Sequence, residues 1–160
     1  ATVGIVRGDA RRLSDLFPAG SLDGIACNPP YTPPGAGIPC GDAARRTARQ
    51  GDTLSLEDLA RGARRALRFG GRLCLCLRPQ RLGEAVGLFQ RFQLEPKRLR
   101  LCQQRPGKAP FLLLLECRRG GRPGMDVGPV LLLEGEDGRP TGELEAIYGD
   151  YRDNPEHQRR

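Results

Sequence analysis

The segment Asn28-Pro29-Pro30-Tyr31 has the residue types that could best do chemistry in this sequence. It follows the short apolar run 24–27, which predicts a buried parallel strand that stops where two prolines remove the N–H donors of the ladder. The side-chain carbonyl of Asn28 and the backbone carbonyl of Pro29 can then both face a ligand, and Tyr31 adds a flat aromatic surface. A planar substrate could donate both hydrogens of an NH₂ group to these carbonyls and keep its nitrogen lone pair free. We therefore predict a catalytic motif for reactions at an amine nitrogen; the structural alternative is a stiff turn with a surface tyrosine.

This motif resembles the signature of class I S-adenosylmethionine-dependent methyltransferases that act on exocyclic or amide nitrogens. In those enzymes Asn-Pro-Pro-Tyr follows the fourth strand of the sheet. The resemblance implies an α/β fold of the Rossmann-like methyltransferase type and S-adenosylmethionine as the cofactor.

Composition sets limits on the class of protein. The 160 residues predict one domain. The net charge of +7 favours a nucleic-acid partner, but only mildly, because 24 of the 26 basic residues are arginines and compositional bias would produce such a pattern. The six cysteines lack C-x-x-C spacing and the single His157 lies in a polar segment, so we predict small buried hydrophobes and no metal site. We see no signal peptide and no apolar run long enough to cross a membrane, so a cytoplasmic location is the default expectation.

The hydrophobic pattern predicts alternating strands and helices that position the motif. Strands are expected at 3–6, 23–27, 72–77, 97–102, 111–117 and 130–133, and helices at 11–17, 55–69, 82–92 and 141–148. Leu and Cys alternate in 72–77, which predicts a central strand covered by helices on both faces. The short connection 103–110 requires strands 97–102 and 111–117 to be antiparallel. The fold class is thus α/β, with a carboxyl-terminal antiparallel hairpin and a disordered polar tail over 150–160.

Two further segments bear on the predicted site. Asp9 closes the first predicted strand at the sheet edge where Asn28 emerges, so both could reach one ligand; capping of the next helix is an equal alternative. Segment 32–50, rich in Pro and Gly and then in Arg, predicts a mobile lid. Ser55, with Asp58 three residues later, predicts a capped helix start.

With these pieces in place, the chain resembles the bacterial valine-tRNA (adenine-N6)-methyltransferase family from about residue 3 to 149. Beyond the motif, the matching landmarks are Ala48-Arg49, Leu56-Glu57-Asp58, Arg78-Pro79, 94–98 and 147–149. Gln50-Gly51 follows the Ala-Arg pair here, where many relatives have His-Glu. This departure weakens the case for a lid contact by those two side chains.

The resemblance implies roles for particular residues. Asp9, Ala10 and Asn28 would contact the cofactor, with Asp9 accepting from the adenine amino group. Tyr31, Arg46 and Arg49 would contact the substrate, which the resemblance identifies as adenine N6 in RNA such as tRNA. It also implies that the strands around Ile25, Leu75, Phe111 and Leu99 are neighbours in this order.

The resemblance has one large gap, because the glycine-rich first turn and the acidic residue after the second strand have no counterpart in the 160 residues. The chain therefore looks like the carboxyl-terminal two thirds (1–149) of a methyltransferase domain without its first strands, and we expect it to be inactive alone. Open strand edges would predict either a homodimer or a disordered amino terminus. Two other functions stay open: N-methylation of a glutamine amide in a protein, and a non-catalytic RNA-binding or interaction domain.

Overall fold

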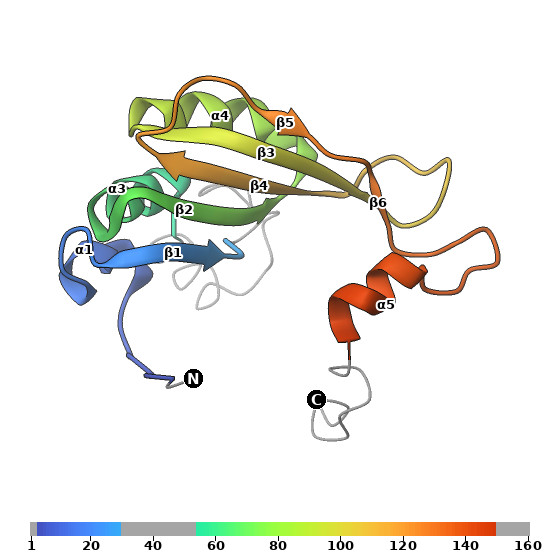
Figure 1. Cartoon of the computed structure of the whole chain (residues 1–160), viewed down its shortest axis with the longest axis horizontal. Helices are drawn as coiled ribbons and strands as arrows, with labels where there is room; N and C mark the ends of the chain where they lie inside the picture. Colours follow the sequence, from blue (N-terminus) through green and yellow to red (C-terminus); the bar gives the residue numbers. More distant parts are fainter. Residues whose placement is uncertain (1–2, 30–53, 150–160) are drawn as a thin grey trace, which may run out of the picture.

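The computed structural model describes residues 3–29 and 54–149 of the chain. Its centre is a six-stranded mixed sheet in the order β1-β2-β4-β3-β5, and β6 also pairs with β3 (Figure 1). The strands are β1 (Leu22–Cys27), β2 (Leu67–Leu77), β3 (Leu94–Gln103), β4 (Leu112–Arg119), β5 (Asp126–Val127) and β6 (Leu131–Leu132). The helices are α1 (Leu13–Leu16), α3 (Leu56–Ala66), α4 (Leu82–Arg91) and α5 (Gly142–Tyr148), with short 3-10 helices at Ala10–Arg12 and Pro79–Arg81.

The order of the long strands confirms the sheet that the sequence predicts. β1 and β2 run parallel, whereas β4 is antiparallel to both β2 and β3. The backbone N–H of Phe111 donates to the carbonyl of Cys102 at 3.1 Å, which closes the β3–β4 hairpin. The fold is therefore an α/β sheet with a terminal antiparallel hairpin, as expected.

Helix α3 begins as predicted and ends earlier than predicted. The backbone N–H of Asp58 donates to Ser55 Oγ at 3.0 Å, and the Ser55 hydroxyl donates to Asp58 Oδ2 at 2.6 Å. The helix ends at Ala66 and not at residue 69, because Leu67 turns to an extended conformation and pairs with Leu22 of β1. Strand β2 is correspondingly longer than the segment 72–77 that the sequence predicts.

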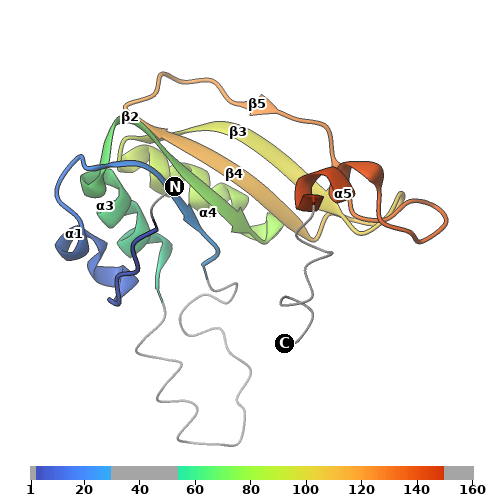
Figure 2. The same ribbon diagram turned by 60° about the horizontal axis from the view of Figure 1, so that its bottom comes forward.

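The hydrophobic core lies on one face of the sheet, which α3 and α4 cover (Figure 2). Its fully buried side chains alternate along β2 and β4, as a half-covered sheet requires. The core consists of Leu56, Leu59, Ala60 and Ala63 of α3, Ala85 and Phe89 of α4, and Leu67, Leu73, Leu75, Leu77, Leu94, Leu99, Leu113, Leu115 and Cys117 of the strands. Helix α1 lies against α3 at Gly62, where a Cβ atom would be 2.8 Å from Leu13 Cβ.

The opposite face of the sheet corrects one expectation. Leu73 and Leu75 of β2 are buried, but Cys74 between them is exposed, Ala26 of β1 is exposed and Leu114 of β4 is 38% exposed. Helices on both faces of this strand were expected from its alternating Leu and Cys. The expectation is wrong for the described part of the chain, because α3 and α4 both pack on the face that carries the leucines.

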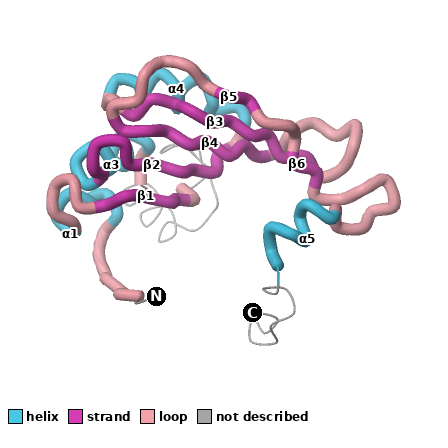
Figure 3. The backbone as a smooth tube through the Cα atoms, viewed as in Figure 1, coloured by secondary structure: helices cyan, strands magenta, loops and turns pink. Residues whose placement is uncertain are grey.

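Residues 3–6 form no strand, so that prediction is also wrong (Figure 3). Val3, Ile5 and Val6 are 83%, 95% and 61% exposed. A strand needs a partner for its N–H and C=O groups, and none of the described strands pairs with this segment.

Strand β1 pairs with β2 alone among the described residues, so its outer edge is open and the homodimer stays a prediction. The predicted lid (32–50) and polar tail (150–160) lie outside the described residues.

The one-sided core predicts which phenylalanine supports the fold. Phe89 of α4 is fully buried, so we expect Phe89→Ala to lower the free energy of unfolding by about 3–5 kcal/mol, through lost transfer energy and the cavity that remains. Phe69→Ala is the matched control, because Phe69 is 76% exposed and its loss should cost less than about 0.5 kcal/mol. Urea unfolding followed by circular dichroism measures both. Equal effects would contradict the assignment of the core to this face.

Candidate active site at the carboxyl ends of β1 and β2

Asn28 is the first residue after β1, at the strand end where the sequence predicts chemistry. Because β1 and β2 are parallel and Cys27 lies opposite Leu75, the next residues of the two strands, Asn28 and Cys76, are also neighbours. The Cys76 thiol donates a hydrogen bond to Asn28 Oδ1, with 3.1 Å between sulfur and oxygen. An amide oxygen has two lone pairs, so Oδ1 can accept a second hydrogen bond. The exposed Asn28 amide is therefore held by β2 and still able to bind a donor.

Pro29 continues the motif and is buried. It has no N–H group, so its burial leaves no backbone donor without a partner. Pro30 and Tyr31 lie outside the described residues, as do Arg46 and Arg49. The structure thus places Asn28 and Pro29 at the predicted strand end, and the roles of all six residues stay predictions.

A hollow of about 830 Å³ opens beside Asn28 on the uncovered face of the sheet. Its walls come from the end of β1 with Asn28 (26–28), from β2 (74–76), β3 (98–100) and β4 (114–116), and from the segment 126–129 and Glu143 of α5. Apolar concave surfaces with a few polar groups are typical of small-molecule sites. The hollow is not predictable from the sequence, because hydrophobic periodicity cannot show that segment 126–129 and α5 return to the same face of the sheet.

Charged side chains at the hollow pair with one another. Glu116 has a side chain only 14% exposed, and it lies 3.8 Å from Arg72 Nε and 3.7 Å from Arg98 Nη1. Arg100 Nη2 lies 2.7 Å from a carboxylate oxygen of Glu143, and Arg100 Nε donates to the carbonyl of Pro129 at 2.8 Å. The contacts of Arg100 anchor α5 and segment 126–129 to β3, so this wall of the hollow has a defined position.

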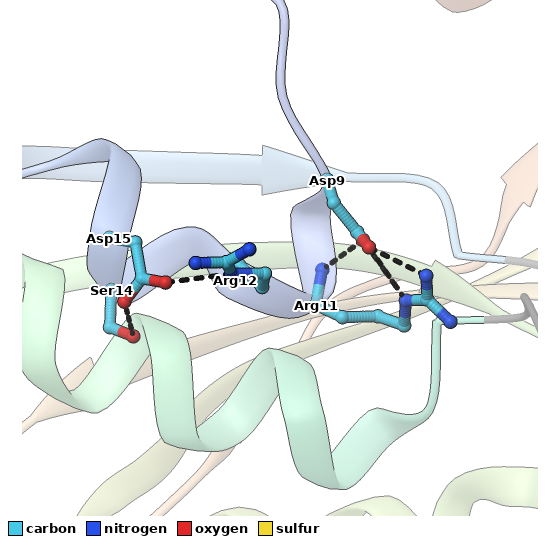
Figure 4. A network of polar contacts seen from close by, with 5 residues as sticks. All are labelled: Asp9, Arg11, Arg12, Ser14 and Asp15. Carbon is cyan, nitrogen blue, oxygen red and sulfur yellow. Dashed lines mark hydrogen bonds and ion pairs between the residues drawn. The ribbon is translucent and has the colours of Figure 1, made fainter.

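The structure places Asp9 at the start of the short helix, and not among the residues that line the hollow (Figure 4). Asp9 Oδ1 accepts from the backbone N–H of Arg11 at 2.9 Å, and Asp9 Oδ2 accepts from Arg11 Nη2 at 2.6 Å. These hydrogen bonds with Arg11 lower the pKa of the Asp9 carboxyl. Capping, one of the two predicted roles, is thus observed. Contact of Asp9 and its neighbour Ala10 with a cofactor remains a proposal.

The cysteines follow the prediction only in part. Cys102 and Cys117 are buried, as predicted, but Cys74 is exposed in the hollow. Desolvation raises the pKa of the half-buried Cys27 thiol and, because Cys74 lies inside the hollow, that of the Cys74 thiol as well. Full burial raises the pKa of Cys117 to about 12. The Cys117 thiol is therefore protonated at neutral pH.

Residues 3–29 and 54–149 contain neither a metal-binding cluster nor a membrane-spanning helix. No three His, Cys, Asp or Glu side chains in this part of the chain come together in a way that could hold a metal ion. No helix in the same part has the length and apolar character that a bilayer crossing requires.

The order of the strands and the terminal antiparallel hairpin are those that the resemblance implies for a methyltransferase-type α/β sheet. Comparison with solved structures agrees. A predicted O-methyltransferase from Agrobacterium tumefaciens matches 89% of the chain with a TM-score of 0.63 and 21% sequence identity. A candidate DNA modification methylase from Thermus thermophilus matches 87% of the chain with a TM-score of 0.50 and 18% identity.

A sequence relative comes closer to the resemblance noted above. The tRNA1(Val) (adenine(37)-N6)-methyltransferase of Parabacteroides distasonis is 31% identical over 148 residues, which cover 87% of the chain. No protein-family model matches the chain. The chain spans 58% of this relative and 57% of each of the two solved structures. These similarities establish the fold and a distant relationship to methyltransferases.

The two environments of the thiols predict different reactivities. Only a thiolate attacks an alkylating agent, so the raised pKa slows modification of both Cys74 and Cys117, whereas burial blocks access to Cys117 alone. At about pH 8, near the usual thiol pKa of about 8.5, we expect iodoacetamide to modify the exposed Cys74 in the folded protein and to leave Cys117 intact. Peptide mass spectrometry with and without urea measures this. Equal modification of both thiols before unfolding would contradict the burial of Cys117.

Proposed function

We propose that the chain is the amine-orienting part of an S-adenosylmethionine-dependent N-methyltransferase that modifies N6 of adenine in RNA, such as tRNA. The observation that carries this proposal is Asn28. Its exposed amide lies at the carboxyl end of a parallel strand, its oxygen is held by Cys76, and an apolar hollow opens beside it. Ligands of open α/β sheets bind at such strand ends.

In this proposal Asn28 and Pro29 hold the target amine. Asn28 Oδ1 and the Pro29 carbonyl each accept one hydrogen of the NH₂ group, which directs the nitrogen lone pair away from both oxygens. These hydrogen bonds strengthen as the nitrogen becomes positive during methyl transfer, so they favour the transition state over the bound substrate. The residues contribute orientation and electrostatics, and no base has to remove a proton before attack.

S-adenosylmethionine would supply the methyl group as an electrophilic sulfonium. The described residues fit the part of the active site that would bind the target amine. They supply only a small part of a cofactor site. Asp9, Ala10 and Asn28 are the proposed cofactor contacts, and the Asp9 carboxylate is already bound by Arg11. Activity assays therefore call for the full-length protein.

RNA as the substrate is supported by the relative and by the charge of the chain. The relative from Parabacteroides is named for methylation of adenine 37 of a valine tRNA. A net charge of +7 favours contact with phosphates. Tyr31 would stack on the extruded base, a contact worth about 1–3 kcal/mol, and Arg46 and Arg49 would contact the RNA.

Two alternatives have their own support. A glutamine amide in a protein presents the same NH₂ group to Asn28 and Pro29, so the same motif could serve protein methylation. A non-catalytic RNA-binding or interaction domain is favoured by the engagement of the Asp9 carboxylate with Arg11. The three functions differ in their product: methylated RNA, methylated protein or none.

Asn28 provides the direct test of the proposed role. We expect Asn28→Ala in the full-length protein to lower kcat by about 10²–10³-fold, the range seen when one preorganised hydrogen-bonding group of a transition state is lost. Affinity for S-adenosylmethionine should fall far less than kcat, because the hydrogen bond to the amine strengthens in the transition state, whereas the proposed cofactor contact of Asn28 is a ground-state contact. Transfer of labelled methyl groups to RNA measures kcat, and calorimetric titration measures affinity.

Gln90→Ala is the control for this test. Gln90 carries the same amide group on the exposed side of α4, where it donates to Glu95 at 3.2 Å and does not line the hollow. Its replacement should leave kcat unchanged. Near-normal turnover by Asn28→Ala would reject the proposed role of Asn28.

A further inference from the structure

We propose that Cys76 is a positioning residue for Asn28: its thiol fixes the plane of the Asn28 side-chain amide and thereby aims Oδ1 at the target amine. The catalytic importance of this rests on the proposed function, whereas the contact itself does not. Neither the motif nor the similarities to other proteins assigns a role to Cys76.

The distance, the choice of partner and the strand pairing all support this role. The sulfur of Cys76 lies 3.1 Å from Asn28 Oδ1, a short distance for a thiol donor. Among the described residues, Cys76 is the hydrogen-bond partner of the Asn28 side chain. It comes from a different strand, and the parallel register that places Cys27 opposite Leu75 fixes its position. The partner is thus part of the rigid sheet and not of a loop.

The amide needs such a partner because Asn28 is exposed at the end of a strand. The terminal torsion of an asparagine side chain has broad minima, so an unheld amide would sample several orientations. Only some of these orientations turn an acceptor toward the amine. The thiol occupies one lone pair of Oδ1 and leaves the second for the substrate. A catalytic group that is already held in place loses less conformational entropy when the transition state forms.

Cys74 offers a matched control on the same strand. It lies two residues before Cys76, on the same side of β2, and it lines the same hollow. The structure gives the Cys74 side chain no hydrogen bond to Asn28. A general effect of losing a thiol from this wall should appear for both cysteines, whereas a positioning effect should appear for Cys76 alone.

The orientation of the amide can be observed directly without substrate or cofactor. The sequence contains two asparagines, Asn28 and Asn154, so the 160-residue chain labelled with ¹⁵N-asparagine gives two pairs of side-chain NH₂ signals in an NMR spectrum. Asn28→Gln removes one pair and assigns it. We expect Cys76→Ala to shift the Asn28 pair and to speed the exchange of its hydrogens with water. Cys76→Ser, which keeps a donor, should leave the pair close to its original position, and Cys74→Ala should not move it.

The side-chain NH₂ signals of Asn28 also test the positioning role if Cys76→Ala disturbs folding. Backbone amide signals report the fold in the same sample, and Cys76→Val, which suits a strand, then makes the same test. Unchanged Asn28 signals in a folded variant that lacks the thiol would overturn the proposal. An equal shift in Cys74→Ala would overturn it too.

A kinetic measurement on the full-length protein separates this proposal from the proposed function. We expect Cys76→Ala to lower kcat by about 2- to 12-fold, the factor that one neutral hydrogen bond represents, with an unchanged KM for S-adenosylmethionine and recovery in Cys76→Ser. If Asn28→Ala retains turnover while the NMR shift is found, the proposed function fails and the contact stands. If Asn28→Ala loses turnover while Cys76→Ala changes neither kcat nor the NMR signals, the positioning role alone fails.

Discussion

The parallel pairing of β1 with β2 is the interaction on which the rest of the structure depends. Parallel neighbours cannot be joined by a tight turn, so the chain between Cys27 and Leu67 must cross over the sheet, and α3 lies in this crossover. The register then places Ile25 opposite Leu73 and Cys27 opposite Leu75. One residue later β1 has ended, and β2 has almost reached its own carboxyl end at Leu77. Asn28 therefore emerges beside Cys76 as a direct result of the strand pairing.

The placement of the core on one face explains the hollow. α3 and α4 both cover the face that carries the leucines of β2, so the alternate residues of β2 and β4 are left for the other face. There Cys74 and Leu114 form an apolar surface, and the hairpin adds Glu116 between two arginines. The same alternation that builds the core thus supplies the walls beside Asn28.

Much of this arrangement follows from the sequence, because local signals specify it. The prolines after Asn28 end a strand, the Ser55 and Asp58 pair begins a helix, and the short connection before Phe111 requires a hairpin. Each of these features depends on residues close together in the chain.

The parts that the sequence did not predict depend on contacts between distant segments. The apolar pattern of residues 3–6 is that of a strand, but a strand forms only where an edge is available to pair with it. The alternation in β2 shows two apolar faces and cannot show which of them helices cover. The contact between Cys76 and Asn28 requires the register of two strands that lie far apart in the chain, at a separation of 48 in sequence. Hydrophobic alternation shows which residues share a face, but a register shift of two residues leaves it unchanged, so it does not specify which residues of two distant strands lie opposite each other.

Identification of the methylated atom tests the central claim most directly. The full-length protein would be incubated with unmodified tRNA and S-adenosylmethionine carrying a deuterated methyl group, and the tRNA would then be digested to nucleosides for mass spectrometry. An amine oriented by Asn28 and Pro29 predicts that the label appears in N6-methyladenosine. Label found only in ribose O-methyl groups, on protein glutamine, or in no product would contradict the account.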